Sequence, residues 1–85
     1  MEKPKTIRIR DKRPTLKEAQ KMVGGLIEII YDDGETQIIG NEEGKVLGQP
    51  FNKEATEYWT KKIADIPYDI LNGDVLILKG KARLD

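Results

Sequence analysis

The sequence predicts a small α+β domain, in which two helices pack against an antiparallel sheet. Three observations support this class. A chain of 85 residues has room for one domain. Several short stretches are alternating or β-branched, as strands are. Two other stretches carry apolar residues at helical spacing behind capping residues. The order reads strand, helix, strand, strand, helix, strand, and we treat residues 1–85 as one domain with residues 1–4 as a frayed lead-in.

The first strand and the first helix have clear local signals. Lys5–Arg10 (KTIRIR) alternates apolar and charged residues, as a half-buried strand does. Thr15 and Glu18 have the spacing of a capping box, which starts a helix. We expect this helix to span Leu16–Val23 and to end at Gly24, a residue suited to the position after a helix.

A hairpin follows the first helix. Leu26–Tyr31 (LIEIIY) and Thr36–Gly40 (TQIIG) are its two arms, with Ile29 and Tyr31 expected on the same face of the first arm. The turn between the arms contains Asp-Gly, which readily adopts positive φ. We expect a second polar turn at Asn41–Gly44 and a short extended piece at Lys45–Leu47.

The second half of the chain predicts one helix and one strand. Asn52 is a suitable N-cap for a helix over Lys53–Ala64, and Pro67 follows it as a stop. Four apolar residues fall on one stripe of this helix and the turn after it: Ala55, Trp59, Ile63 and Ile66. Val75–Leu78 (VLIL) is apolar on both sides, which is typical of a central strand covered on both faces or of a strand in a dimer interface.

This element order is compatible with a ferredoxin-like sandwich, two helices over one antiparallel sheet. Other α+β arrangements also fit, because the first helix is short for a crossover connection.

The missing residue types restrict the chemistry. The chain contains no histidine, no cysteine and no serine. Ser-His and Cys-His nucleophiles are therefore excluded, as are imidazole and thiolate ligands for transition metals. We expect a protein that is not an enzyme and that needs no cofactor. Carboxylate chemistry remains available, so a metal-dependent carboxylate enzyme is the weaker alternative.

The charges sum to zero but are unevenly distributed. Met1–Arg13 is strongly basic, and Glu28–Glu57 is strongly acidic. A neutral domain lacks the overall positive field of a non-specific nucleic-acid binder, so we do not expect nucleic acid to be the main partner. The chain has no long apolar run and no signal-peptide pattern near Met1. We therefore expect a cytoplasmic protein without a membrane partner.

The basic residues form the leading candidate site. Arg8 and Arg10 share one face of the first strand, and guanidinium groups on a strand suit phosphate recognition. If the first and last strands are neighbours, basic residues of the tail join them on this face, provided that the tail stays extended. A tyrosine beside a turn could stack on a base. The alternative interpretation is a solvated sheet face whose charges discourage edge pairing. The candidate anion- or nucleotide-binding residues are Arg8, Arg10, Lys12, Arg13, Tyr31, Lys79 and Lys81.

The acidic residues form the alternative site. Asp32, Asp33 and Glu35 lack the spacing of a calcium loop, and we interpret them as turn chemistry and predict no metal site there. The second turn could instead present Asn41, Glu42 and Glu43 to a basic partner protein.

Three segments carry a family resemblance: TLKEAQKMVGGLIEII, NEEGKVLGQPFNKEAT and GDVLIL. They resemble a family of small domains of unknown function from phages, prophages and other mobile elements, in which a VGG-[YL]-I-E strand precedes N-E-E-G, P-x-N, A-T and G-D-V motifs. The chain departs from this pattern at Gly48-Gln49-Pro50, where the family more often has leucine before proline. The resemblance brings no catalytic residue to carry over.

The resemblance implies an accessory protein of a virus or mobile element, acting in the cytoplasm of the host. Together with the basic strand, it leads us to expect binding of a small phosphorylated ligand. Because small domains often gain stability by oligomerising, we also expect a homo-oligomer. The sharpest form of this expectation is a counter-defence protein that sequesters a host signalling nucleotide. The alternative is an inhibitor of a host defence, transcription or replication factor that acts through its acidic turns.

Overall fold

The computed structural model describes residues 3–44, 47–63 and 70–84. Within them, the expected order of strands and helices is confirmed, and the domain is an α+β fold. The elements are β1 (Thr6–Ile9), α1 (Leu16–Val23), β2 (Ile27–Asp32), β3 (Thr36–Asn41), α2 (Lys53–Ile63), β4 (Val75–Lys79) and a 3-10 helix, η1 (Gly80–Ala82).

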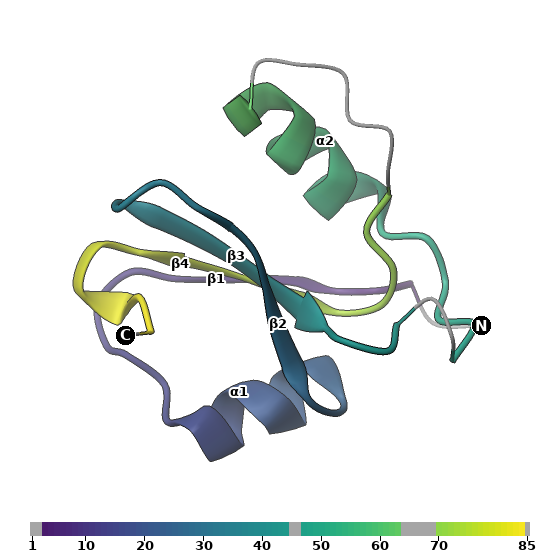
Figure 1. Ribbon diagram of the computed structural model, residues 1–85, viewed down its shortest axis with the longest axis horizontal. Helices are drawn as coiled ribbons and strands as arrows, with labels where there is room; N and C mark the ends of the chain where they lie inside the picture. Colours follow the sequence, from purple (N-terminus) through teal and green to yellow (C-terminus); the bar gives the residue numbers. More distant parts are fainter. Residues whose placement is uncertain (1–2, 45–46, 64–69, 85) are drawn as a thin grey trace.

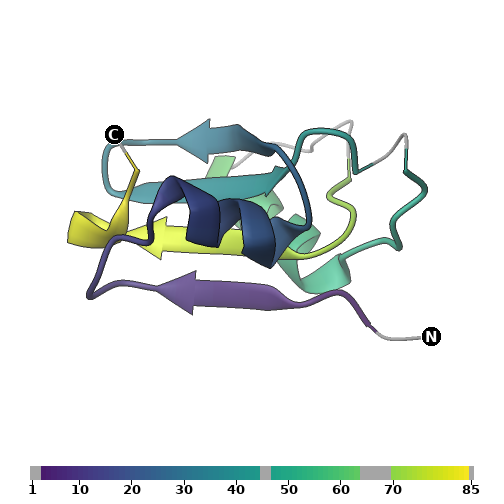
Figure 2. The ribbon, with the colours of Figure 1, turned by 90° about the horizontal axis from the view of Figure 1, so that it is seen from below.

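The four strands form one mixed sheet in the order β1-β4-β3-β2. β1 pairs with β4 in parallel, whereas β3 pairs antiparallel with both β4 and β2. The expected antiparallel sheet is therefore wrong, and so is the ferredoxin-like arrangement. The physical reason is the path of α1, which crosses the sheet from the edge strand β1 to the opposite edge strand β2 (Figure 2). Such a crossover leaves β1 and β2 pointing in the same direction.

The two helices cover opposite faces of the sheet, as Figure 1 shows. Each face has its own apolar core, and β3 and β4 contribute alternate residues to both. This coverage explains why Val75–Leu78 is apolar on both sides, as the sequence predicted for a central strand. The α1 core contains Ala19, Val23, Ile39, Leu76, Leu78 and Ala82; the α2 core contains Ile38, Ala55, Leu71, Val75 and Ile77.

Both ends of α1 follow the predicted capping chemistry. The Thr15 hydroxyl accepts a hydrogen bond from the Glu18 backbone N–H at 3.0 Å, and the Glu18 carboxylate accepts one from the Thr15 N–H at 2.8 Å. Gly24 has φ of 83°, and its N–H donates to the carbonyl of Gln20. The helix is therefore stopped at a residue that tolerates the left-handed conformation.

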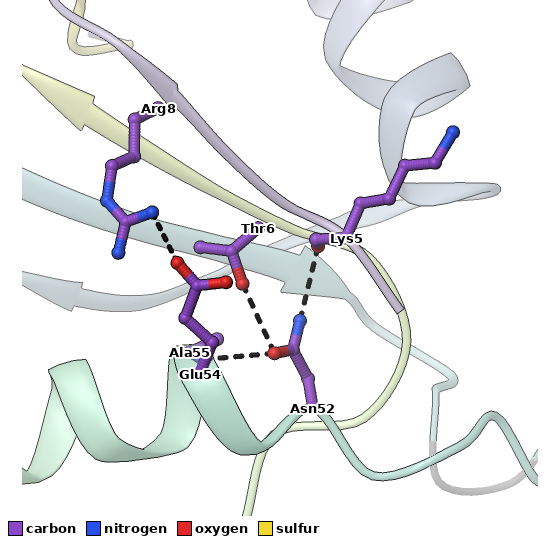
Figure 3. A network of polar contacts seen from close by, with 6 residues as sticks. All are labelled: Lys5, Thr6, Arg8, Asn52, Glu54 and Ala55. Carbon is purple, nitrogen blue, oxygen red and sulfur yellow. Dashed lines mark hydrogen bonds and ion pairs between the residues drawn. The ribbon is translucent and has the colours of Figure 1, made fainter. Parts of the chain in front are cut away.

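Asn52 caps α2 and fixes the helix to the sheet (Figure 3). Its side-chain oxygen accepts hydrogen bonds from the Ala55 N–H at 3.0 Å and from the Thr6 hydroxyl at 3.2 Å. Its amide nitrogen donates to the carbonyls of Lys5 at 3.2 Å and Gly73 at 2.9 Å. One buried side chain thus joins the start of α2 to β1 and to the loop before β4.

Three sequence expectations concern the ends of these elements. The helix expected over Lys53–Ala64 is described to Ile63, and Ala64 and Ile66 lie outside the described residues. Of the extended piece expected at Lys45–Leu47, Leu47 lies in a turn and the rest is outside the described residues. Proline at position 67 is also outside them.

A β-bulge in β2 changes which face Tyr31 occupies. Ile29 is opposite Ile39, but Tyr31 is opposite Ile38, so Ile30 is the extra residue. Ile30 and Tyr31 both pack against the α2 core. The simple alternation that placed Tyr31 beside Ile29 is wrong, because one inserted residue reverses the side of every residue after it.

The chain does not stay extended after β4. Gly80 has φ of 58° and begins the turn of η1, after which the chain folds back towards β3. The Leu84 N–H donates to the Gln37 side-chain oxygen at 2.6 Å, and the Gln37 side-chain nitrogen donates to the Leu84 carbonyl at 2.7 Å. The expected alignment of Lys79 and Lys81 on one extended strand is therefore wrong.

Candidate functional site: a basic face under α2

Basic residues of β1 and β4 lie on the face of the sheet that α2 covers. The first and last strands are neighbours in the sheet, which meets the condition set in the sequence analysis. Arg8 pairs with Ile77, and Ile77 belongs to the α2 core, so Arg8 points to the same side. Lys79 is two residues beyond Ile77 along β4 and shares its face.

Tyr58 of α2 is the centre of this basic group. The Arg8 guanidinium carbon lies 5.7 Å from the centre of the Tyr58 ring, and the Lys79 ammonium nitrogen lies 5.6 Å from it. The Lys62 nitrogen, from the next turn of α2, lies 5.8 Å away. Each distance is within the range of a cation–π contact. We call Arg8, Lys62, Lys79 and Tyr58 together the basic face.

One carboxylate of α2 balances part of this charge. Arg8 Nη1 lies 2.5 Å from Glu54 Oε2 (Figure 3), and the two side chains are 49% and 60% exposed. In the described part of the chain, Lys62 and Lys79 form no ion pair. Three cations therefore surround one ring with a single paired carboxylate, which makes a surface suited to an anion.

Two hydroxyl groups on this side of the sheet have unused hydrogen-bonding capacity. Thr36 is paired with Lys79 across β3 and β4, so the two side chains share a face. The Thr36 hydroxyl and the Tyr58 hydroxyl are both buried, and neither has a hydrogen-bond partner among the described residues. A buried hydroxyl without a partner costs free energy, and both would gain from a movement that brought an acceptor within reach.

Tyr31 joins the same region because of the bulge in β2. It packs against the α2 core, and its hydroxyl donates to Asp33 Oδ2 at 3.0 Å. Burial raises the pKa of Tyr31, and the bond to Asp33 raises it further, so the phenol stays protonated at neutral pH. Tyr58 packs against the same core, which places the two rings in one neighbourhood.

The Asp33 carboxylate is held in its charged form by the hairpin. Its Oδ1 accepts the backbone N–H groups of Thr36 at 2.7 Å and Glu35 at 2.9 Å. These two bonds lower the pKa of Asp33 to about 2, with smaller contributions from Tyr31 and Lys62.

The remaining basic candidates lie elsewhere. Arg10 is exposed and follows the end of β1. The Arg13 side chain donates to the carbonyl of Arg83 at 2.6 Å, which ties it to the segment after η1. Lys12 lies near the start of α1. The pKa of Glu18 is lowered mainly by the hydrogen bond from the Thr15 backbone, and the charge of Lys12 adds a small contribution in the same direction.

Lys81 lies in η1 and is exposed.

Of the seven residues proposed from the sequence, the structure therefore groups Arg8, Lys79 and Tyr31. Sequence reasoning missed the three residues of α2 that complete the group. Glu54, Tyr58 and Lys62 recur at intervals of four, so they line one side of the helix, and that spacing was the available signal.

In the acidic turn that forms the alternative site, Asn41 has a mainly structural role. Asn41 is only 9% exposed. Its side-chain nitrogen donates to the Val23 carbonyl at 3.2 Å, and its side-chain oxygen accepts the Glu43 N–H at 2.8 Å. The Asn41 amide thus holds the turn against the end of α1. Glu42 and Glu43 remain exposed.

A cleft of about 370 Å³ lies beside this turn, on the α2 face but away from the basic face. We call it the Trp59 cleft. Its walls come from β2, β3, α2 and the segment before β4. The residues that line it are Glu28, Ile29, Ile30, Gly40, Asn41, Glu42, Gly44, Trp59, Ile70, Leu71 and Asn72.

Two kinds of feature are absent from the described residues. No three acidic side chains come together there in an arrangement that could hold a metal ion. No described helix has both the length and the apolar composition needed to cross a membrane.

The fold and the basic face define a small α+β domain with a candidate anion-binding surface. The sequence matches the family described as "Domain of unknown function (DUF3846)" over residues 1–83, and the chain belongs to that family. The search of curated proteins and the search of solved structures found no match to the chain.

Proposed function

We propose that this domain acts by binding, without catalysis, and that its ligand is a small phosphorylated molecule held at the basic face. The observation that carries the proposal is the convergence of Arg8, Lys62 and Lys79 on one tyrosine ring. Like charges at this separation repel one another, and a phosphate placed among them would replace that repulsion with charge-assisted hydrogen bonds.

The Arg8–Glu54 pair makes this exchange easy. An exposed ion pair typically contributes about 0.2–1 kcal/mol, so Arg8 can leave Glu54 for a phosphate oxygen with little loss of stability. Lys62 and Lys79 need no such exchange. The bound phosphate would thus meet one guanidinium group and two ammonium groups.

Tyrosine rings beside the cations favour a nucleotide over inorganic phosphate. Tyr31 and Tyr58 lie in one neighbourhood on the α2 face, and aromatic rings stack on bases of any identity. In its sharpest form, the proposal is capture of a host signalling nucleotide by a protein of a phage or other mobile element. The genetic setting rests on the family resemblance described above.

Isothermal titration calorimetry would test the proposal. The probes are cyclic dinucleotides, cyclic oligonucleotides, ADP-ribose and inorganic pyrophosphate. We expect saturable binding of at least one nucleotide probe, and a loss of at least tenfold in affinity for Arg8→Ala/Lys79→Ala. The matched control is Lys17→Ala/Lys21→Ala, which removes the same charge from α1 on the opposite face. If no probe gives heat above dilution, the proposal fails.

We further propose that the domain self-associates, because a chain of this size gains stability from a second copy. Light scattering coupled to size-exclusion chromatography measures this directly. A mass above that of one chain is expected, and a mass of 9.7 kDa across the concentrations of the binding experiment would contradict it.

A further inference from the structure

The Trp59 cleft differs from the basic face in both charge and lining. Among the described residues, its walls carry two carboxylates, Glu28 and Glu42, and no basic side chain. Neither carboxylate forms an ion pair within the described residues. The other walls combine the amide side chains of Asn41 and Asn72 with apolar side chains, the indole of Trp59 and the aliphatic chain of Ile30 among them.

The sheet shapes the floor of this cleft. Glu28 is opposite Gly40 in the β2–β3 pair, and Gly40 shares the face of Ile38, which belongs to the α2 core. Glu28 therefore points to the α2 side, and the missing side chain at Gly40 lets the Ile30 side chain pack against the floor. A Cβ atom at Gly40 would lie 2.9 Å from the end of the Ile30 side chain.

Apolar side chains beside two carboxylates suit a cation that has an alkyl stem. An arginine or lysine side chain has this form, because its methylene groups pack on apolar surface while the charged end reaches a carboxylate. An aromatic ring such as Trp59 adds a favourable surface for the cation.

The outer edge of β2 borders the cleft on the same side. β2 is the last strand of the sheet, so the backbone groups along its outer edge pair with no strand in the described part of the chain. An extended segment can add to such an edge through main-chain hydrogen bonds while its alternate side chains enter neighbouring pockets.

We propose that the Trp59 cleft and the β2 edge together bind an extended, arginine- or lysine-bearing segment of a partner protein. The backbone of that segment pairs with Ile27–Ile29, ahead of the bulge. One basic side chain enters the cleft between Glu28 and Glu42, beside Trp59. This site is independent of the basic face, and it takes the opposite charge.

The protein carries a built-in reporter for this site, because Trp59 is its only tryptophan. The probe is a capped nonapeptide that alternates valine with arginine, titrated while Trp59 fluorescence is recorded. The first comparison peptide has glutamate in place of arginine. The second keeps arginine but has alternate backbone nitrogens methylated, so that it cannot pair with a strand edge. Arginine amide tests a free cation of the same chemistry.

We expect a saturable fluorescence change with the arginine peptide alone. Glu28→Gln/Glu42→Gln should weaken it at least tenfold, whereas Glu35→Gln/Glu57→Gln, with the same change in net charge outside the cleft, should stay within twofold. If the two double variants weakened peptide binding equally, the net charge of the protein alone would explain the loss, and the proposal would be overturned. Equal affinity for arginine amide or for the methylated peptide would also overturn it, because strand pairing would then contribute nothing. Binding of the glutamate peptide, or no response to any probe, would have the same consequence.

Discussion

Arg8 and Glu54 form an ion pair that joins the edge strand β1 to the first turn of α2, with 2.5 Å between Nη1 and Oε2. Both side chains are exposed, so the pair contributes little to stability. The Arg8 guanidinium group also lies over the Tyr58 ring. Glu54 therefore occupies the guanidinium group that the proposed phosphate ligand needs, and it competes with that ligand.

Removing this competitor should improve binding. For Glu54→Gln we expect an affinity for the nucleotide probe that is up to about fivefold higher, which corresponds to roughly 1 kcal/mol. The free energy of unfolding should fall by less than about 1 kcal/mol. Calorimetry and urea denaturation measure the two quantities. Glu57→Gln, whose ion pair with Lys53 is also exposed, is the control, and an equal gain in that variant would contradict the competition.

Asn52 should contribute more to stability than a helix cap alone. Asn52→Asp keeps an acceptor for the Ala55 N–H but cannot donate to the Lys5 and Gly73 carbonyls. We expect it to lose about 2–4 kcal/mol of unfolding free energy, as much as Asn52→Ala, because buried carbonyls lose their donor. Urea denaturation measures the loss. Thr15→Ala, which removes only a cap, should cost about 1 kcal/mol, and an Asn52→Asp loss no larger than that would refute the role of the two donated bonds.

Two glycines with similar backbone conformation should respond differently to alanine. Gly34 has φ of 87° with nothing within 4 Å of an added Cβ, whereas a Cβ at Gly73, with φ of 75°, would collide with the Gln49 side chain. Gly34→Ala should cost about 1 kcal/mol from the left-handed backbone. Gly73→Ala should cost about 2–4 kcal/mol because Gln49 must also be displaced. Thermal and urea denaturation give both values, and equal costs would show that the crowding is absent.

Stability should fall in acid as Asp33 is protonated. The pKa of Asp33 is about 2 in the folded protein and about 4 in an unfolded chain. The carboxylate therefore contributes its full stabilisation above pH 4, and this is lost as the pH falls towards 2. In the Asp33→Asn variant, the side-chain amide oxygen can still accept the backbone bonds, but the group does not titrate. The melting temperature of this variant should therefore depend less on pH between 4 and 2, which circular dichroism measures. Glu35→Gln, on the same turn, should follow the wild-type profile.

The parts of the fold that the sequence predicted are those set by neighbouring residues. The Thr15–Glu18 capping box, the Gly24 stop and the Asn52 cap each depend on atoms within a few positions along the chain. The apolar composition of Val75–Leu78 also identified a strand covered on both faces. In each case the signal is local, although the two helices that cover Val75–Leu78 come from distant parts of the chain.

The parts that could not be predicted depend on distant segments. β3 is buried along its whole length although Thr36, Gln37 and Asn41 are polar, because bonds from other parts of the chain satisfy the Gln37 and Asn41 side chains. The bulge at Ile30 moves Tyr31 to the α2 face, and no residue pattern announces it. Arg8 and Lys79 of the basic face were proposed from the sequence, on the condition that the first and last strands are neighbours, and the sheet order meets that condition. The α2 half of the face was missed, although its four-residue spacing was visible.

The parallel pairing of β1 with β4 has a consequence for how the protein is made. β1 is synthesised first, and β4 is its only partner strand among the described residues. During translation, β1 must wait unpaired while α1, the hairpin and α2 leave the ribosome. The sheet can close only when Lys79 has emerged. A ribosome stalled before Val75 should therefore carry a nascent chain that proteases cut within β1.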